Sequence, residues 1–332
     1  MKRLTIALFL AALCLVSLTA CGSDAGKTAE QDKRVVIWTS GEDYKNEYYL
    51  SECRKQFPDY DITLEYMNTS SMALKVMEEG EKCSCDILLS EEYGYLDMCA
   101  DYLVPPDDFD FSIFLDELLP ESRKYTPECK NGGCVALNPA VLAEKGLPAP
   151  TSYEDLLNPM YQGLISMPSP ATSGTGYMFL RQLTNEWGED AAFDYFEKLT
   201  KNVLQYTASG SGAVNLLTMG ETAVALGMTG QAVREINDGV GLEIVFFDEG
   251  SPYSMYGNAI LAKSADRQAV RDVFRYLATD LCRENNERFF PEQVFKDFTP
   301  EIPNFPTNIR YGDMSNDTLS EKERLLEKWT FS

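Results

Sequence analysis

From Arg34 onward, the chain alternates short runs of β-branched and aromatic residues with longer stretches in which apolar residues recur at helical spacing. This alternation is typical of an α/β fold, in which largely parallel strands are covered by helices. We therefore expect strands at 35–38, 62–66, 87–89, 134–137, 164–167, 223–226, 242–247 and 259–261. Helices are expected at 44–56, 71–79, 177–186, 191–202, 213–219, 231–237 and 267–286.

The 332 residues exceed the length over which one hydrophobic core keeps growing, so the sequence predicts two lobes. We expect lobe one to comprise residues 34–136 plus 250–282, and lobe two to comprise 137–249 plus 283–332. The acidic segment 104–108 contains two prolines and is expected to be a surface loop where the chain leaves lobe one.

The chain carries 52 acidic and 29 basic side chains, a formal net charge of −23. Such a surface lacks the positive charge that neutralises nucleic-acid phosphates, so nucleic acid is not expected as a partner. The sequence contains no histidine, the usual general base and the commonest neutral metal ligand. Ser173 stands in a glycine-rich turn, but Ala171 replaces the first glycine of a Gly-x-Ser-x-Gly nucleophile motif. We therefore expect no catalysis, no metal and no cofactor.

The N-terminus has the features of a secretory signal. Lys2 and Arg3 precede an uncharged apolar run at 4–20, which ends in small residues followed directly by Cys21. We expect a signal peptide at 1–20, a lipid on the Cys21 thiol, and a lipidated tether at 21–33 that holds a monomer on the extracytoplasmic face of the cell membrane. An uncleaved anchor helix is the alternative.

Seven of the nine cysteines follow Cys21 in the chain. Cys129 and Cys134 flank a Gly-Gly pair that can reverse the chain, so a local disulfide between them is one expectation. Buried inert thiols explain the remaining cysteines, because paired C-x-x-C spacing for zinc is lacking.

Small hydroxyl-bearing residues and glycines follow several predicted strands and precede predicted helices. In open α/β sheets, ligands bind beyond the carboxyl ends of strands, where helix N-termini offer backbone N–H groups to an anion. The alternative is that each cluster only caps a helix. The candidate ligand-binding residues are Thr39, Ser40, Gly41, Ser70, Ser71, Ser90, Thr172, Ser173, Gly174, Thr175, Gly176, Thr229 and Tyr256.

The densest of these clusters, Thr172–Gly176, is expected to hold a phosphate-like group with a neutral set of donors. Two further features leave alternatives open. The acidic pairs Glu42-Asp43 and Glu91-Glu92 would suit an ammonium group or be solvated surface charge. The segment Tyr253–Asn258, which contains Tyr256, would line the cleft or pack in the core.

The chain resembles the extracellular substrate-binding lipoproteins of ABC importers, in the two-lobed class that includes ferric-ion, phosphonate and sugar-phosphate binders. Besides the signal and Cys21, the matching segments occur in a fairly specific order along nearly the whole mature chain. They are Val35–Ser40, Asn68–Ser71, Cys85–Leu88, Ser166–Pro168 with Ala171–Gly176, and Met219–Glu221 before Ala223–Gly227.

The resemblance implies a type 2 periplasmic-binding-protein-like fold, in which two lobes joined by hinge strands close on a small solute and present it to a membrane permease. The hinge is expected near Leu137–Pro139 and Phe247–Ser251. Ferric members carry a tyrosine pair after the strand that here ends at Leu226, where this chain has Gly227–Gly230. A small anionic solute, phosphonate or phosphorylated, is therefore expected. The alternatives are a ferric ion or chelate, a polyamine or sugar, and a ligand-sensing surface lipoprotein.

Overall fold

The computed structural model describes residues 33–105, 108–315 and 318–331. Its strands are β1 (Arg34–Thr39), β2 (Asp61–Tyr66), β3 (Ile87–Glu92), β4 (Leu103–Val104), β5 (Tyr125–Leu137), β6 (Ile165–Pro168), β7 (Val203–Thr207), β8 (Val224–Met228), β9 (Glu243–Val245) and β10 (Tyr253–Leu261). Its α-helices are α3 (Asp43–Gln56), α4 (Thr69–Glu79), α5 (Tyr93–Met98), α6 (Pro139–Lys145), α7 (Gly174–Trp187), α8 (Glu189–Leu199), α9 (Gly212–Thr218), α10 (Thr229–Asn237), α11 (Gln268–Tyr276), α12 (Cys282–Phe289) and α13 (Leu319–Lys328).

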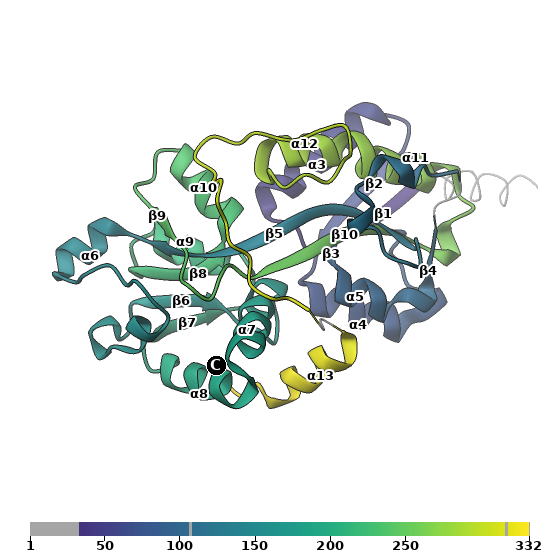
Figure 1. The fold of residues 1–332 in the computed structure, drawn as a ribbon. Coiled ribbons are helices and arrows are strands. Elements are labelled where there is room, and N and C mark those ends of the chain that lie inside the picture. Colours follow the sequence, from purple (N-terminus) through teal and green to yellow (C-terminus); the bar gives the residue numbers. More distant parts are fainter. Residues whose placement is uncertain (1–32, 106–107, 316–317, 332) are drawn as a thin grey trace, which may run out of the picture.

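The strands form one sheet in the order β2-β1-β3-β10-β5-β8-β6-β7. The strands β1, β2 and β3 are parallel at one end, and β6, β7 and β8 are parallel at the other. Between them, β10 and β5 run antiparallel to their neighbours. The predicted α/β architecture of two lobes, each with a mostly parallel sheet flanked by helices and joined by strands, is confirmed (Figure 1).

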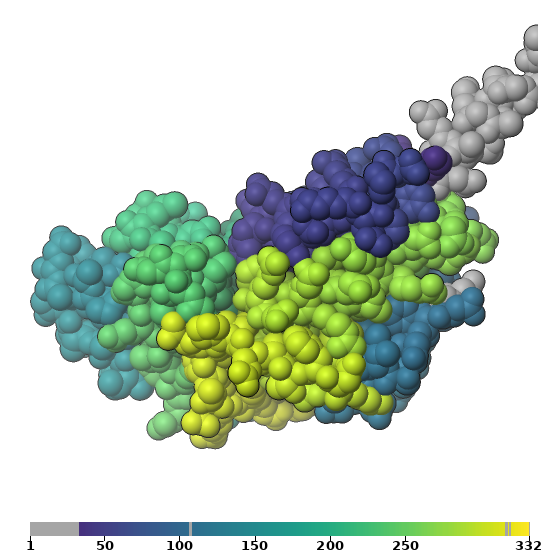
Figure 2. All heavy atoms as spheres, turned by 90° about the horizontal axis from the view of Figure 1, so that it is seen from above, coloured from purple at the N-terminus to yellow at the C-terminus, as the bar shows by residue number. Residues whose placement is uncertain are grey.

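Each half of the sheet is covered by hydrophobic cores on both faces. We call the half with β1, β2 and β3 lobe one, where Val35 and Ile37 pack toward α3 and α11, and Val36 and Trp38 pack toward α4. We call the half with β6, β7 and β8 lobe two, whose larger core includes side chains of α7 and α8. Figure 2 shows the purple N-terminal segment beside the yellow-green segment of α11 and α12, with the teal segments of lobe two at the other end.

Three connections between the lobes can be followed in the described residues. On β5, Lys130 pairs with Met255 of β10, whereas Gly133 pairs with Met228 of β8, so the strand crosses between these two residues. The predicted hinge at 137–139 is wrong, because Leu137 already pairs with Val224 inside lobe two. The second crossing leads into β10, just after the segment predicted as the other hinge. The third crossing is formed by the segment after α12. This segment runs beside the second crossing, where the Ser251 N–H donates to the carbonyl of Arg310 at 2.8 Å.

Each predicted strand and helix overlaps an element of the structure, but the strands predicted at 134–137 and 259–261 cover only the last part of β5 and β10, which begin at Tyr125 and Tyr253. The elements β4, β7, α5, α6 and α13 were not predicted. The chain also stays in lobe one after segment 104–108, because Phe114 packs there beside Cys282 and Phe295. The predicted lobe boundary at 282/283 runs through the continuous helical segment formed by α11, the π-helical turn Leu277–Leu281 and α12.

The predicted disulfide is wrong. Among the residues that the structure describes, all seven cysteines are free and buried. Cys129 and Cys134 lie on the same strand, since the Gly-Gly pair continues β5 instead of turning it. Five extended residues separate Cα atoms by about 17 Å, well beyond the reach of a disulfide.

The predicted signal peptide, the lipidated Cys21 and nearly all of the predicted tether lie outside the described residues. Within the described ranges, none of the helices combines the length and the apolar character needed to cross a bilayer.

Candidate ligand-binding site

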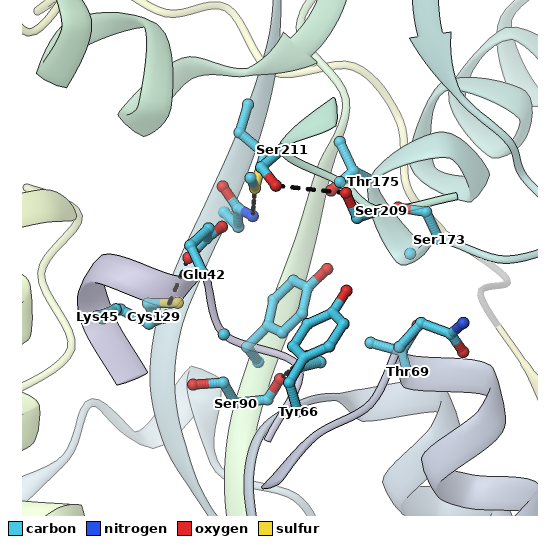
Figure 3. A pocket seen from close by; sticks show the side chains of 18 of the residues that line it. Glu42, Lys45, Tyr66, Thr69, Ser90, Cys129, Ser173, Thr175, Ser209 and Ser211 are labelled. Atoms are coloured by element: carbon cyan, nitrogen blue, oxygen red, sulfur yellow. Dashed lines mark hydrogen bonds and ion pairs between the residues drawn. The ribbon is translucent and has the colours of Figure 1, made fainter. Parts of the chain in front are cut away.

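A cavity of about 230 Å³ lies where the two lobes meet, at the carboxyl ends of the parallel strands. Segments from both lobes and from the crossing strands line it (Figure 3). Lobe one supplies Ser40, Gly41, Glu42, Asp43, Lys45, Tyr66, Asn68, Thr69 and Ser90. Lobe two supplies Thr172, Ser173, Gly174, Thr175, Ser209, Gly210, Ser211 and Met228, and the remaining wall is formed by Cys129, Asn131, Tyr256 and Phe290.

The wall from lobe two consists of hydroxyl groups and two helix N-termini. Helices α7 and α9 begin after Ser173 and Ser211, and neither serine side chain caps its own helix within the described structure. The backbone N–H groups of a first helical turn lack intrahelical partners and carry partial positive charge. The hydroxyls of Ser209 and Ser211 lie 3.4 Å apart beside them. This wall therefore offers many neutral donors to a negatively charged group.

Glycine brings the two segments of this wall together. A Cβ atom on Gly210 would stand 2.5 Å from the Thr175 hydroxyl oxygen, which is closer than Cβ contacts come in proteins. A glycine at this position therefore lets the β7–α9 loop pack directly on the first turn of α7.

The wall from lobe one is held by a hydrogen-bonded loop after β1. The Thr39 hydroxyl accepts from the Gly41 N–H at 3.0 Å, and the Asn46 side chain donates to the Gly41 carbonyl at 2.6 Å. The Ser40 hydroxyl donates to the carbonyl of Ser90. Ser90 itself has a positive φ of 56°, an uncommon conformation for a residue other than glycine.

A buried ion pair lies behind this wall. The Lys45 ammonium is 3.6 Å from a carboxylate oxygen of Glu128 and 3.8 Å from one of Glu42. The side chains of Lys45 and Glu128 are only 3% and 0% exposed. Burial by itself lowers the pKa of Lys45, but the carboxylates of Glu128 and Glu42 outweigh it and raise that pKa above its usual value. Lys45 therefore stays charged, so a cationic side chain accompanies the neutral donors that the sequence led us to expect.

The same Glu128 oxygen also accepts from the Ser90 hydroxyl at 2.8 Å. This bond links the buried ion pair to a residue of the cavity wall.

Two buried polar atoms of the cavity lining remain without a protein partner. The Thr69 hydroxyl and the Asn131 carbonyl oxygen make no hydrogen bond to any described residue. Both side chains are at least 95% buried, and an unsatisfied buried polar atom costs about 1 to 3 kcal/mol.

Tyr256 of β10 lies on the floor of the cavity, with its hydroxyl close to the start of α7. Burial raises the pKa of Tyr256 well above its usual value, as do the nearby carboxylates of Glu92 and Glu42. The phenol therefore remains a neutral hydrogen-bond donor.

The structure brings together eight of the thirteen candidate residues in the cavity lining: Ser40, Gly41, Ser90, Thr172, Ser173, Gly174, Thr175 and Tyr256. The other five lie away from the wall. Thr39 is fully buried at the end of β1. Ser70 and Ser71 bond to Asn68, which caps α4.

The last two of these five pack against other parts of lobe two. Gly176 packs against the chain after β6, where a Cβ atom would stand 2.4 Å from the Pro168 carbonyl oxygen. Thr229 is buried at the start of α10, beside Gly132 of β5.

The thirteen candidate residues leave out much of the wall, although Glu42 and Asp43 were weighed as a site for an ammonium group. The N-cap position of Asn68 and the serines around Gly210 were available signals, because both follow predicted strands. Lys45 lies three residues after Glu42, the N-cap residue of α3. From the sequence alone, this spacing predicts an ion pair on the exposed surface of a helix. The lining residues missing from the candidate set are Glu42, Asp43, Lys45, Tyr66, Asn68, Thr69, Cys129, Asn131, Ser209, Gly210, Ser211, Met228 and Phe290.

Three known proteins share this chain's sequence or fold. An uncharacterized protein of Haemophilus influenzae is 28% identical over 94% of this chain and 94% of its own length. The phosphoglycerate transport regulatory protein PgtC of Salmonella typhimurium is 25% identical over 48% of this chain and 41% of its own. The periplasmic binding protein AfuA of Actinobacillus pleuropneumoniae, solved with exogenous fructose 6-phosphate, superimposes with a TM-score of 0.79. That match has 22% identity and covers 89% of this chain and 97% of AfuA.

A family model for bacterial extracellular solute-binding proteins matches residues 104–305, more than half of the chain. The matched segment runs from β4 through both lobes to the third crossing, and it contains the whole lobe-two wall of the cavity. The proteins of this family bind solutes outside the cytoplasm. The chain therefore belongs to the bacterial extracellular solute-binding protein family.

Proposed function

We propose that the protein captures a small organic solute that carries a phosphate or phosphonate group, without changing it chemically. The observation that carries this proposal is the wall from lobe two, where two helix N-termini and the hydroxyls of Ser173, Thr175, Ser209 and Ser211 meet at one cavity. Oriented N–H groups and hydroxyls suit phosphate oxygens, which accept several hydrogen bonds at once.

The opposite wall suggests the rest of the solute. Glu42 and Asp43 contribute carboxylate oxygens that accept hydrogen bonds, and Asn68 contributes an amide. Such groups suit hydroxyl or ammonium donors on the body of the solute. The acidic side of the cavity therefore favours a solute with an anionic end toward α7 and a donor-rich end toward α3.

The net negative charge of the protein does not oppose this arrangement. Charges on the surface are screened beyond about 8 to 10 Å in physiological salt. The buried Lys45 ammonium also offsets part of the charge of Glu42 and Glu128. Local donors therefore determine which solute binds.

The names of two similar proteins support a phosphorylated solute. AfuA was solved with fructose 6-phosphate, and PgtC is named for phosphoglycerate transport. Ferric iron fits less well, because it prefers several anionic oxygen ligands. Within the described residues, no group of three or more acidic or cysteine side chains is placed to hold a metal ion.

A thermal-shift screen tests the proposal. Fructose 6-phosphate, 3-phosphoglycerate and aminoethylphosphonate are compared with fructose, spermidine and ferric citrate. A solute that binds only the folded state raises the melting temperature, by RT ln(1 + [L]/Kd) in free energy. At least one phosphoryl compound should stabilise the protein more than its unphosphorylated analogue. A shift with fructose, spermidine or ferric citrate alone would contradict the proposal.

We also propose that Cys21 carries a lipid and that the protein passes its solute to the permease of an ABC importer. The support is the small-residue run before Cys21 and the family membership. Replacing Cys21 by Ala should release the protein from the membrane fraction or leave its signal uncleaved. Normal processing and retention of this variant would contradict the anchor.

A further inference from the structure

Helix α13 lies across the boundary between the two lobes (Figure 1). We propose that its Lys322 forms a latch with Glu92 of β3, which biases the protein toward the closed form and so regulates access to the cavity. The inference rests on the proposed capture of a solute between the lobes.

The helix is anchored on lobe two. Leu325 and Trp329 are buried in the core that contains Tyr177 of α7. Glu321 also accepts from the Arg181 guanidinium of α7 at 3.0 Å. Helix α13 should therefore move with lobe two.

Lys322 faces the other lobe from this anchored helix. Its ammonium forms an ion pair with the carboxylate of Glu92, and both side chains are only 1% exposed. The same ammonium lies 3.7 Å from the ring centroid of Tyr95 on α5 and 4.4 Å from that of Tyr177 on α7. One charged group is thus enclosed by a carboxylate and a ring from lobe one and by a ring from lobe two.

Opening the lobes would disrupt this arrangement. A buried charge is stable only while its partner stays in place, because separation leaves two desolvated ions unpaired until water reaches them. Since α13 is fixed to α7, a movement of α7 away from β3 pulls Lys322 from Glu92. The ion pair therefore stabilises the closed arrangement specifically.

The latch also adjoins the cavity. Ser90, two residues before Glu92, lines the cavity wall. A Cβ atom on Gly174, the first residue of α7, would lie 3.7 Å from the Glu92 Cγ atom. The same two segments, β3 and the start of α7, thus set the distance between the lobes at the cavity and the distance between Glu92 and Lys322.

Small-angle scattering of the ligand-free protein tests the latch without depending on the solute. The variants are Lys322→Met, Glu92→Gln and the double variant. The double variant removes both charges, which is often neutral for stability, so it remains informative if a single variant does not fold. The matched control is Lys328→Met on the same helix, whose lysine pairs with Glu189 of α8 inside lobe two.

The radius of gyration should increase for the folded latch variants and stay at the wild-type value for the control. Circular dichroism establishes that each variant is folded. Folded latch variants with the wild-type radius would overturn the proposal, as would a wild-type protein that is already open in solution. Because no solute is added, either result leaves the proposed solute class untouched.

Discussion

Gly174 at the start of α7 lies so close to Tyr256 of β10 that a Cβ atom on the glycine would stand 2.9 Å from the tyrosine hydroxyl oxygen. The same position lies 3.7 Å from the Thr69 hydroxyl of α4. The first helical turn of lobe two therefore meets both a crossing strand and the opposite lobe at one point. Only a residue without a side chain allows this approach.

Replacing Gly174 by Ala should weaken solute binding, because the added methyl displaces Tyr256 or keeps the lobes apart. We expect the dissociation constant measured by calorimetry to rise about tenfold or more, the effect of about 1.4 kcal/mol. Gly241→Ala is the matched control, since its Cβ position has no atom within 4 Å. Equal affinities for the two variants would show that the approach at Gly174 has no role in closure.

Removing a hydroxyl from the α7 wall should cost affinity but little stability. Ser173→Ala or Thr175→Val each removes one donor to a charged group, worth about 1.5 to 3 kcal/mol, so affinity should fall about ten- to a hundredfold. Ser71→Ala is the control, because Ser71 was expected at the site but its N–H group only bonds to Asn68. The expectation fails if Ser71→Ala weakens binding and the other two variants do not.

The position of the site followed from the sequence because parallel strands bring their carboxyl ends to one edge. Ser40 and the cluster Thr172–Thr175 follow a strand, Ser90 lies within β3, and all of them reach the cavity. Thr39 and Gly176 belong to the same clusters but serve the loop and the helix packing. Local pattern locates a segment, whereas the direction of each side chain depends on its neighbours in the fold.

Contacts between segments that are distant in the sequence could not be predicted from it. The Lys45 ammonium can be buried because it forms an ion pair with the Glu128 carboxylate on β5. No local feature of the sequence links these two residues. The ion pair between Glu92 and Lys322 likewise joins two segments that lie far apart in the sequence. The run Cys129–Cys134 suggested a turn because of its glycines, yet pairing with β10 and β8 keeps it extended.

Breaking the buried pair behind the cavity should destabilise the fold. Lys45→Met leaves Glu128 buried without its cation, so the free energy of unfolding in urea should drop by about 3 to 5 kcal/mol. The double variant Lys45→Met, Glu128→Gln should recover most of that loss. Lys198→Met is the control, since an exposed ion pair such as the one it forms with Asp194 contributes little to stability. A single variant as stable as wild type would mean that water already solvates Glu128.

The last prediction concerns the buried carboxyl of Glu91. Burial, and then the neighbouring Glu92 carboxylate, raise the pKa of Glu91 well above its usual value, although the Glu92 N–H donates to it at 2.9 Å. The folded state therefore binds a proton that the unfolded state releases above its own pKa of about 4.3. Glu91 thus contributes most to stability below about pH 4, and that contribution declines as the pH rises through the folded pKa.

Glu91→Gln should remove this decline, because a neutral amide replaces the protonated acid. Urea unfolding of both proteins between about pH 4 and pH 8 measures the difference. The variant should gain stability relative to wild type as the pH rises, and a constant difference across this range would show that Glu91 ionises alike in both states. The matched control is Glu47→Gln on α3, where the same substitution is made at an exposed position.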